Sequence, residues 1–262
     1  AWTWEEGKNP NLSITKNTTI DLNGHTLTIS KSGQCFEVQS SATLTIMDSK
    51  GAQDTVDYPG GTVYGNKATL DGNTLTYYIT TSAPNGTGTK EALEQHTVTL
   101  SGAGKILCGE TSDQAIRVYN GGTLEIQGGV LQNTGGKHIV CVEGGTLTMS
   151  GGYIVGGGRD NETGGGIYVN NNGTVNISGG VIAANSGTKG GGICIEGGSF
   201  TMSGGVISGN QTKGSASTGN CNTGLGGGVF AQDTTVTISG GYITNNLETL
   251  KCGQEGFGCH GG

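Results

Sequence analysis

A five-residue motif, Ser-Gly-Gly-hydrophobic-Ile, recurs along the second half of the chain. Each copy follows a short segment in which polar and apolar residues alternate, as in Thr146-Leu147-Thr148-Met149. These segments start 23 to 36 residues apart, at Thr123, Thr146, Thr174, Ser199 and Thr235. A period of this size fits three short strands and three turns, which is one coil of a parallel β-helix. The motif occupies residues 150–154, 178–182, 203–207 and 239–243, with a looser copy at 127–131.

The alternation also predicts which side chains lie inside the coil. Residues two apart in a strand share a face, so the apolar members of each segment should stack in the core. Glycine triplets at 164–166, 190–192 and 226–228 open the remaining strand of the coil. We therefore predict an all-β fold, a right-handed single-stranded parallel β-helix with three strands per coil. The predicted internal stacks are Leu147, Val175, Phe200 and Val236; Met149, Ile177, Met202 and Ile238; and Ile154, Ile182, Ile207 and Ile243.

A column of asparagines follows the repeated motif. Asn185, Asn210 and Asn246 each stand five residues after the second glycine, and Gly157 takes this place in one coil. Stacked Asn side chains can hydrogen-bond along the coil axis, as amide ladders do. The alternative is that Asn is simply a frequent turn residue.

The composition excludes several classes of protein. Gly accounts for 54 of 262 residues but has no three-residue period, so the chain is not collagen-like. Hydrophobic residues are 32% of the chain, which suffices for a solenoid, where each strand buries alternate residues. Charged residues are only 13% and the net charge is −7, so a nucleic-acid partner is not expected. No apolar run is long enough to span a membrane.

The repeats divide the chain into three parts. Residues 1–48 are expected to form an N-terminal cap and the first coils, because an end coil must cover an open core and sheet edge. Residues 49–94 interrupt the pattern and are expected to form a hairpin-like insertion. Regular coils should occupy 95–262, resuming at Thr97-Val98-Thr99-Leu100, and should continue beyond residue 262.

Two outward columns of the coil contain candidate functional residues. Alignment of the glycine-triplet strands places Glu143, Asn170, Glu196 and Gln232 in one column, with the two carboxylates about 10 Å apart. That separation is near the upper limit for the acid pair of an inverting glycosidase. The neighbouring column contains Arg117, Tyr168 and Phe230, which could bind sugar rings or a partner protein. The alternatives are solvated carboxylates and ordinary face residues packed under a loop.

The seven cysteines fall into separate groups. Cys141 and Cys194 share the column of Tyr168 and should lie about 10 Å apart, too far for a disulfide. Cys221, Cys252 and Cys259 lie in loops of successive coils, where we expect one disulfide among three possible pairings. The spacing of Cys252 and Cys259-His260 does not match a zinc site, and we predict no metal and no cofactor.

Several of these motifs resemble a known group of proteins. The glycine triplets followed by Ile-x-x-Asn, as in Ile182-Ala183-Ala184-Asn185, resemble the Gly-Gly-Ala-Ile and Phe-x-x-Asn repeats of bacterial polymorphic outer-membrane adhesins. Asp-Leu-Asn-Gly-His at 21–25 is similar to a motif that opens repeats in adhesin-like right-handed β-helix proteins of gut Firmicutes and methanogens. The resemblance covers most of the chain except 49–94, and it implies a β-helix at the bacterial cell surface. The chain departs from the adhesin pattern in using Ile before x-x-Asn.

These observations together favour a secreted or cell-surface bacterial β-helix that acts as an adhesin or stalk and has no catalytic activity. Its expected partner is a glycan or a host surface protein. Polysaccharide lyases and glycoside hydrolases with this fold are the first alternative. Those families carry clustered Asp residues on adjacent coils with an Arg, or a Gly-His-Gly and an Arg-x-Lys motif, whereas this chain has two Arg, Arg117 and Arg159, and its only partial match is His260-Gly261-Gly262. The second alternative is an ice-binding face made of Thr-x-Thr ladders at Thr26/Thr28, Thr43/Thr45, Thr97/Thr99, Thr146/Thr148 and Thr235/Thr237, interrupted by Glu125, Asn176 and Ser199.

Overall fold

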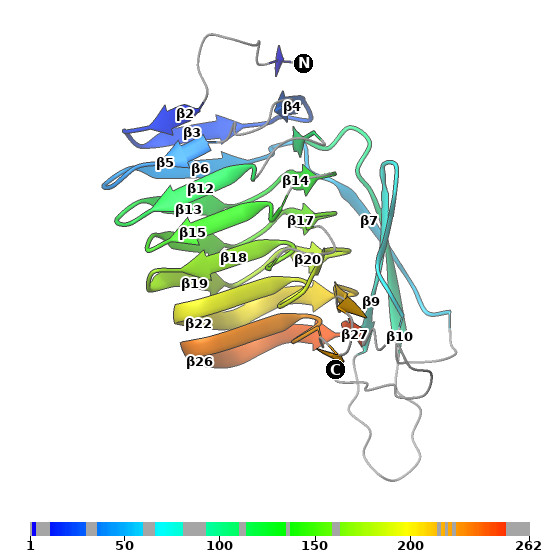
Figure 1. The fold of residues 1–262 in the computed structure, drawn as a ribbon. Coiled ribbons are helices and arrows are strands. Elements are labelled where there is room, and N and C mark those ends of the chain that lie inside the picture. The colour runs from blue at the N-terminus through cyan, green and yellow to red at the C-terminus, as the bar shows by residue number, and fades with distance from the viewer. Residues whose placement is uncertain are drawn as a thin grey trace.

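The protein is dominated by one parallel sheet that curls around an axis. The computed structural model describes residues 2–3, 11–29, 36–59, 66–80, 93–109, 114–134, 137–158, 163–213, 216–217, 220–221 and 224–249. The sheet contains 18 strands and turns through 313° about the axis, which gives a parallel, β-solenoid-like fold (Figure 1). The predicted all-β class and the parallel pairing of successive coils are confirmed.

The sheet consists of three columns of stacked strands, and two long strands, β22 (Ile193–Ser208) and β26 (Val229–Thr244), pass through all three. The first column contains β2 (Leu12–Ile14), β5 (Phe36–Val38), β12 (Ile116–Tyr119), β15 (Val140–Glu143) and β18 (Ile167–Asn170). The second contains β3 (Thr18–Asp21), β6 (Thr43–Met47), β13 (Thr123–Ile126), β16 (Thr146–Met149) and β19 (Gly173–Ile177). The third contains β1 (Trp2–Thr3), β4 (Thr26–Ile29), β11 (Lys105–Cys108), β14 (Val130–Asn133), β17 (Tyr153–Val155) and β20 (Val181–Ala183).

The register inside the solenoid agrees with the alternation in the sequence. Leu147 pairs with Val175, and Val175 pairs with Phe200; all three side chains are fully buried. The neighbouring stack of Met149, Ile177 and Met202 is buried in the same way. Because residues two apart in a strand share a face, this register follows once the first pair is aligned.

The last coil corrects one part of this prediction. Val236, Ile238 and Ile243 keep the predicted register in β26, but their exposed fractions are 46%, 55% and 38%. Among the described residues, no further strand of these columns lies beyond β26 to cover them (Figure 1). Register is set by the backbone ladder, whereas burial also requires a neighbour on both sides.

The two glycines of the repeated motif have distinct structural roles. The second glycine has a positive φ in every copy, for example 83° at Gly180 and Gly205, a conformation that other residues rarely adopt. At the first glycine, a Cβ on Gly179 or Gly204 would collide with the carbonyl oxygen of Ser150 or Ser178 in the preceding coil. The motif therefore recurs because the turn packs directly against the coil before it.

The asparagine column forms the expected ladder along the axis. Asn210 Nδ2 donates to Asn246 Oδ1 at 3.0 Å, and Asn185 Nδ2 donates to Asn210 Oδ1 at 3.0 Å. The three Nδ2 groups also donate to the carbonyl oxygens of Ile154, Ile182 and Ile207. These amides therefore satisfy buried polar groups that the turn would otherwise leave without partners.

The insertion is a four-stranded antiparallel sheet that lies against the third column (Figure 1). Its strands are β7 (Gln53–Asp57), β8 (Thr69–Asp71), β9 (Thr74–Thr80) and β10 (Leu93–Thr99), in the order β7-β10-β9-β8. The expectation that the coils resume at Thr97 is wrong, because Thr97 pairs with Thr55 and Thr76 in this sheet. Alternation is the same in both kinds of sheet and does not reveal the partner. The solenoid ladder resumes at Lys105.

Apolar side chains join the insertion to the solenoid. Leu75, Tyr77 and Val98 of the insertion pack with Val155 and Ala183 of the third column in a second buried cluster. At the far end, Asn245 Nδ2 of the last coil donates to the carbonyl oxygen of Tyr78 at 3.2 Å. The insertion thus covers the third column from its middle coils to its last one.

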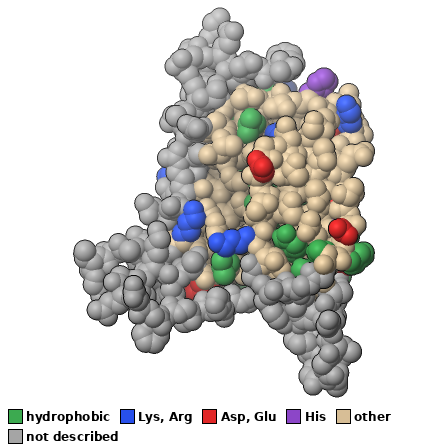
Figure 2. Space-filling view, turned by 90° about the vertical axis from the view of Figure 1, so that its right-hand side faces the viewer, with side chains coloured by type: hydrophobic (Ala, Val, Ile, Leu, Met, Phe, Trp, Pro, Cys, Tyr) green, Lys and Arg blue, Asp and Glu red, His purple; other side chains and the backbone are tan. Residues whose placement is uncertain are grey.

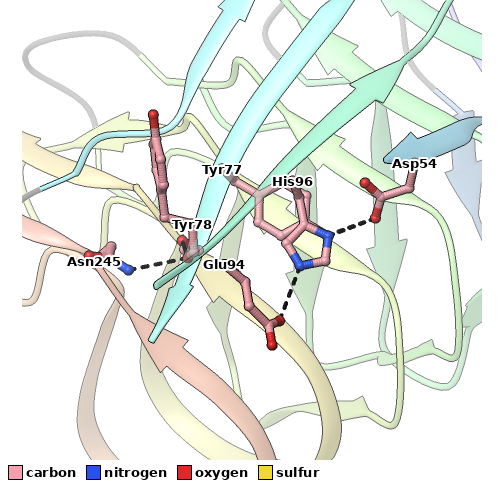
Figure 3. A network of polar contacts seen from close by, with 7 residues as sticks. Asp54, Tyr77, Tyr78, Glu94, His96 and Asn245 are labelled. Atoms are coloured by element: carbon pink, nitrogen blue, oxygen red, sulfur yellow. Dashed lines mark hydrogen bonds and ion pairs between the residues drawn. The ribbon is translucent and has the colours of Figure 1, made fainter. Parts of the chain in front are cut away.

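A polar network lies beside this apolar contact (Figure 3). The rings of Tyr77 and His96 stack with centroids 4.5 Å apart. His96 Nδ1 lies 2.8 Å from Asp54 Oδ2, and His96 Nε2 lies 3.6 Å from Glu94 Oε2. Burial, and then the negative charge of Asp54, raise the pKa of nearby Tyr153 to about 12. The network belongs to the junction between the insertion and the solenoid.

The outer face of the insertion is polar and carries a row of threonines, with Asp57 and Asp71 on the same side of the sheet. Thr55, Thr97, Thr76 and Thr69 form one row across its four strands. Figure 2 shows the corresponding side of the molecule, where charged side chains are few and scattered among neutral ones.

The remaining strands are β21 (Ser186–Gly187), β23 (Gln211–Lys213) and β27 (Leu247–Thr249), which form a small sheet, and the pair β24 (Ala216–Ser217) and β25 (Asn220–Cys221).

Candidate functional site

The first column presents the predicted strip of large side chains on its outer side, which we call the first face. Arg117 pairs with Cys141, Cys141 with Tyr168, Tyr168 with Cys194 and Cys194 with Phe230. The sequence alignment of this column is therefore correct. The insertion covers the third column and leaves the first face free of described strands (Figure 1).

Arg117 is the centre of a polar cluster at the N-terminal end of the face. Its Nε lies 3.5 Å from Glu143 Oε1 in the next coil, and its Nη1 donates to Tyr119 Oη at 3.4 Å. Tyr119 Oη donates in turn to Glu37 Oε1 at 3.2 Å. Burial lowers the pKa of Arg117, but Tyr119 and Glu143 outweigh it and hold the pKa above its ordinary value. The guanidinium is consequently held by Glu143 directly and linked to Glu37 through Tyr119.

A second cluster surrounds Glu196 two coils further along. Lys189 Nζ lies 2.9 Å from Glu196 Oε1, and Tyr168 Oη donates to Glu196 Oε2 at 3.0 Å. The hydrogen bond from Lys189 lowers the pKa of Glu196, and the bond from Tyr168 adds to this, so Glu196 is ionised at neutral pH. Lys189 Nζ also lies 5.1 Å from the ring centroid of Phe230. This cluster therefore joins two of the three predicted binding residues.

The ring of Tyr168 rests on a buried histidine. His138 is 8% exposed and stacks against Tyr168 with ring centroids 5.3 Å apart. Burial raises the pKa of Tyr168 to about 12, and its bond to Glu196 contributes. Tyr168 is thus held by His138 at its ring and by Glu196 at its hydroxyl group, while part of its side chain stays exposed.

The two cysteines of the column lie beneath these large neighbours. Cys141 and Cys194 point outward but are buried, and neither forms a disulfide. Burial raises the pKa of Cys194 to about 12, so its thiol is unreactive at neutral pH. The prediction that they do not bond to each other is confirmed. Cys252, Cys259 and the side chain of Cys221 lie outside the described residues.

The outer side of the second column carries hydroxyl groups. Thr43, Thr123, Thr146, Thr174, Ser199 and Thr235 form one file through six coils. Ser199 continues this file, and its Oγ donates to Thr174 Oγ1 at 3.1 Å. Glu125 and Asn176 interrupt the adjacent file. Thr26 and Thr28 pair with Lys105 and Leu107 in the third column, and Thr97 and Thr99 lie in the insertion, so these two pairs do not join the threonines of the second column.

The side chains of the first face offer ion pairs, amide groups and aromatic rings, which can form hydrogen bonds and ring contacts. Among the residues that the structure describes, no group of three or more His, Cys, Asp or Glu side chains could hold a metal ion. No helix in the described part of the chain is long and apolar enough to cross a membrane.

Sequence reasoning found the column of Arg117, Tyr168 and Phe230 but not the residues that fix it. Tyr119 could have been found, because it stands two residues after Arg117 and shares its face. Lys189 and His138 precede their strands in turns, and alternation gives no direction for a turn side chain.

A comparison of the whole chain with protein-family models, curated proteins and solved structures finds no match.

Proposed function

We propose that this chain is part of a secreted or cell-surface bacterial protein, in which a right-handed β-helix with three strands per coil and a capped N-terminal end binds a glycan through its first face. The protein acts as an adhesin or adhesive stalk and performs no chemistry of its own. The resemblance of its Ile-x-x-Asn and Asp-Leu-Asn-Gly-His motifs to adhesin-like proteins supports the cell-surface setting.

The observation that carries the proposal is the fixed arrangement of the first face. Arg117, Tyr168 and Phe230 fall in one column, and neighbouring charges or rings hold each of them. Aromatic rings flanked by carboxylates and amides combine apolar contact with hydrogen-bond acceptors, which is the usual composition of a sugar site. A rigid site also loses little conformational entropy on binding.

The carboxylates of this face are poorly suited to acid catalysis. A glycosidase acid needs a raised pKa so that it is protonated at working pH. Lys189 and Tyr168 lower the pKa of Glu196, and Glu143 is paired with Arg117. These contacts favour a binding role over the lyase or hydrolase alternative.

A glycan array with the purified chain tests the proposal. We expect binding that decreases in Arg117→Ala, Tyr168→Ala and Phe230→Ala and is retained in Thr148→Ala, whose side chain lies on the second column. Far-UV circular dichroism establishes that each variant is folded. If the chain binds a host protein that carries no glycan and binds no glycan on the array, the ligand is a protein.

A parallel screen for cleavage of uronate polymers and mucin glycans tests the absence of catalysis. We expect no products. Turnover that is lost in Glu143→Gln or Glu196→Gln would overturn the non-catalytic assignment.

A further inference from the structure

Over its last four described coils, the first face repeats every two coils rather than every coil. The outward residues of these coils are Cys141 and Glu143, then Tyr168 and Asn170, then Cys194 and Glu196, then Phe230 and Gln232; the preceding coils, with Glu37 and with Arg117 and Tyr119, do not follow this order. A coil with cysteine and glutamate therefore alternates with a coil that has an aromatic residue and an amide. The second column does not share this order of cysteine and aromatic residues: one of its outward files carries hydroxyl residues in successive coils, and the other alternates threonine with Glu125 and Asn176.

Contacts between side chains follow the same two-coil repeat. The glutamates of these four coils are each paired with one cation, Glu143 with Arg117 and Glu196 with Lys189. Each small cysteine lies buried between coils with larger side chains, which keeps the aromatic residues separate along the axis. One unit of the face is thus an aromatic ring, an amide and a neutralised carboxylate.

Strand spacing gives this unit a length. Neighbouring strands lie about 4.8 Å apart, so two coils span about 9.6 Å, and the four steps from Arg117 to Phe230 span about 19 Å. A ligand that uses all the units must be extended, must lie parallel to the solenoid axis, and should repeat over the length of two coils. An extended polysaccharide whose successive sugars face opposite ways has a two-sugar repeat of similar length.

Charge restricts the ligand further. The protein carries a net charge of −7, and both cations that contact the carboxylates of the first face are already paired with them. A uronate or sulfated polymer would have to break these pairs and would meet Glu37, Glu143 and Glu196. Hydroxyl groups of a neutral sugar can donate to the same carboxylates without disturbing the pairs.

We propose that the first face binds a linear, neutral, extended polysaccharide parallel to the solenoid axis, with one disaccharide for every two coils. This inference rests on the proposed glycan-binding function and specifies its ligand. Sugar ring faces contact Tyr168 and Phe230, and sugar hydroxyls bond to Glu143, Glu196 and the amides of Asn170 and Gln232.

A chain-length series tests the inference. Isothermal titration calorimetry with neutral β-1,4-linked oligosaccharides of one to six sugars, from glucose, mannose and N-acetylglucosamine, should give affinity that rises up to about four sugars, the length of the face by strand spacing, and then levels off. Oligogalacturonate of the same lengths should bind at least tenfold more weakly than the best neutral series. Glu196→Gln should weaken binding of the tetrasaccharide about tenfold, the equivalent of one hydrogen bond to a charged group, and Tyr168→Ala should weaken it by a similar factor through loss of a ring contact.

Controls separate the inference from the proposed function. Thr148→Ala on the second column should leave the affinity unchanged. Equal affinity for disaccharide and hexasaccharide, or tighter binding of oligogalacturonate, would overturn the axial neutral ligand while glycan binding itself stands. Failure of every glycan on the array, neutral and acidic, would overturn the proposed function.

Discussion

The asparagine ladder offers a sharp test of how the coils are held together. Asn210 is its central member and is completely buried. Its Nδ2 donates to Ile182 O at 2.9 Å and to Asn246 Oδ1 at 3.0 Å. Its Oδ1 accepts from the backbone N of Asn185 at 3.1 Å and from Asn185 Nδ2 at 3.0 Å. Asn210→Ala therefore leaves four buried polar groups without these partners.

The magnitude follows from that count. Each buried hydrogen bond contributes about 1 kcal/mol net, and an orphaned buried group costs somewhat more, so Asn210→Ala should destabilise the fold by about 4 to 6 kcal/mol. This loss is a large part of the roughly 5 to 15 kcal/mol that holds an ordinary domain folded. Asn246→Ala removes three such bonds in the last described coil and leaves one fewer group without a partner than Asn210→Ala does, so it should cost about 3 to 4 kcal/mol.

Urea unfolding followed by circular dichroism measures these differences. The exposed Asn120→Ala variant is the control and should change stability by less than about 0.5 kcal/mol. Asn210→Asp keeps both acceptor bonds but places a carboxylate against two oxygens, which raises the pKa of the new group. Its stability should be greatest at low pH and be lost as pH rises through that pKa. A loss below about 1 kcal/mol in Asn210→Ala would refute the ladder as a source of stability.

Three further predictions concern burial, alkaline pH and the thiols. Ile182→Asp replaces a side chain that is 1% exposed by a charged one. It should lower the free energy of unfolding, measured in urea, by about 4 kcal/mol or more. Ile243→Asp, in the same column but 38% exposed, should be tolerated, and equal losses would contradict the open last coil. Burial raises the pKa values of Tyr153 and Tyr168 to about 12, so the folded state holds protons that the unfolded chain releases from about pH 10. Stability should therefore fall as pH rises from about 10 to 12. The ionisation of tyrosines can be followed by ultraviolet absorbance in the native protein and in its Tyr153→Phe and Tyr168→Phe variants. The prediction would be refuted if these two tyrosines ionise near pH 10 in the native protein. The thiol of Cys194 should react with a thiol reagent only after unfolding, and a Cys141–Cys194 peptide in a non-reducing digest would disprove the strand register.

Local sequence determined the coil and its register. Alternation in segments such as Thr146-Leu147-Thr148-Met149 defines the inward residues, and the paired glycines mark turns where positive φ and close packing are required. The columns of Asn185 and Tyr168 followed from the same alignment, because in-register parallel pairing repeats every position from coil to coil. Periodic information is sufficient for contacts between successive coils.

Tertiary structure decided what covers each face. Thr97-Val98-Thr99 has the same alternation as a solenoid strand, and only its antiparallel partners assign it to the insertion. The insertion buries the third column and leaves the first without a described strand over it, while the lack of a described neighbour beyond β26 exposes Val236 and Ile238. Lys189 and His138 reach Glu196 and Tyr168 from turns. These contacts depend on packing between segments distant in sequence or on the direction of a turn side chain, neither of which a two-residue period encodes.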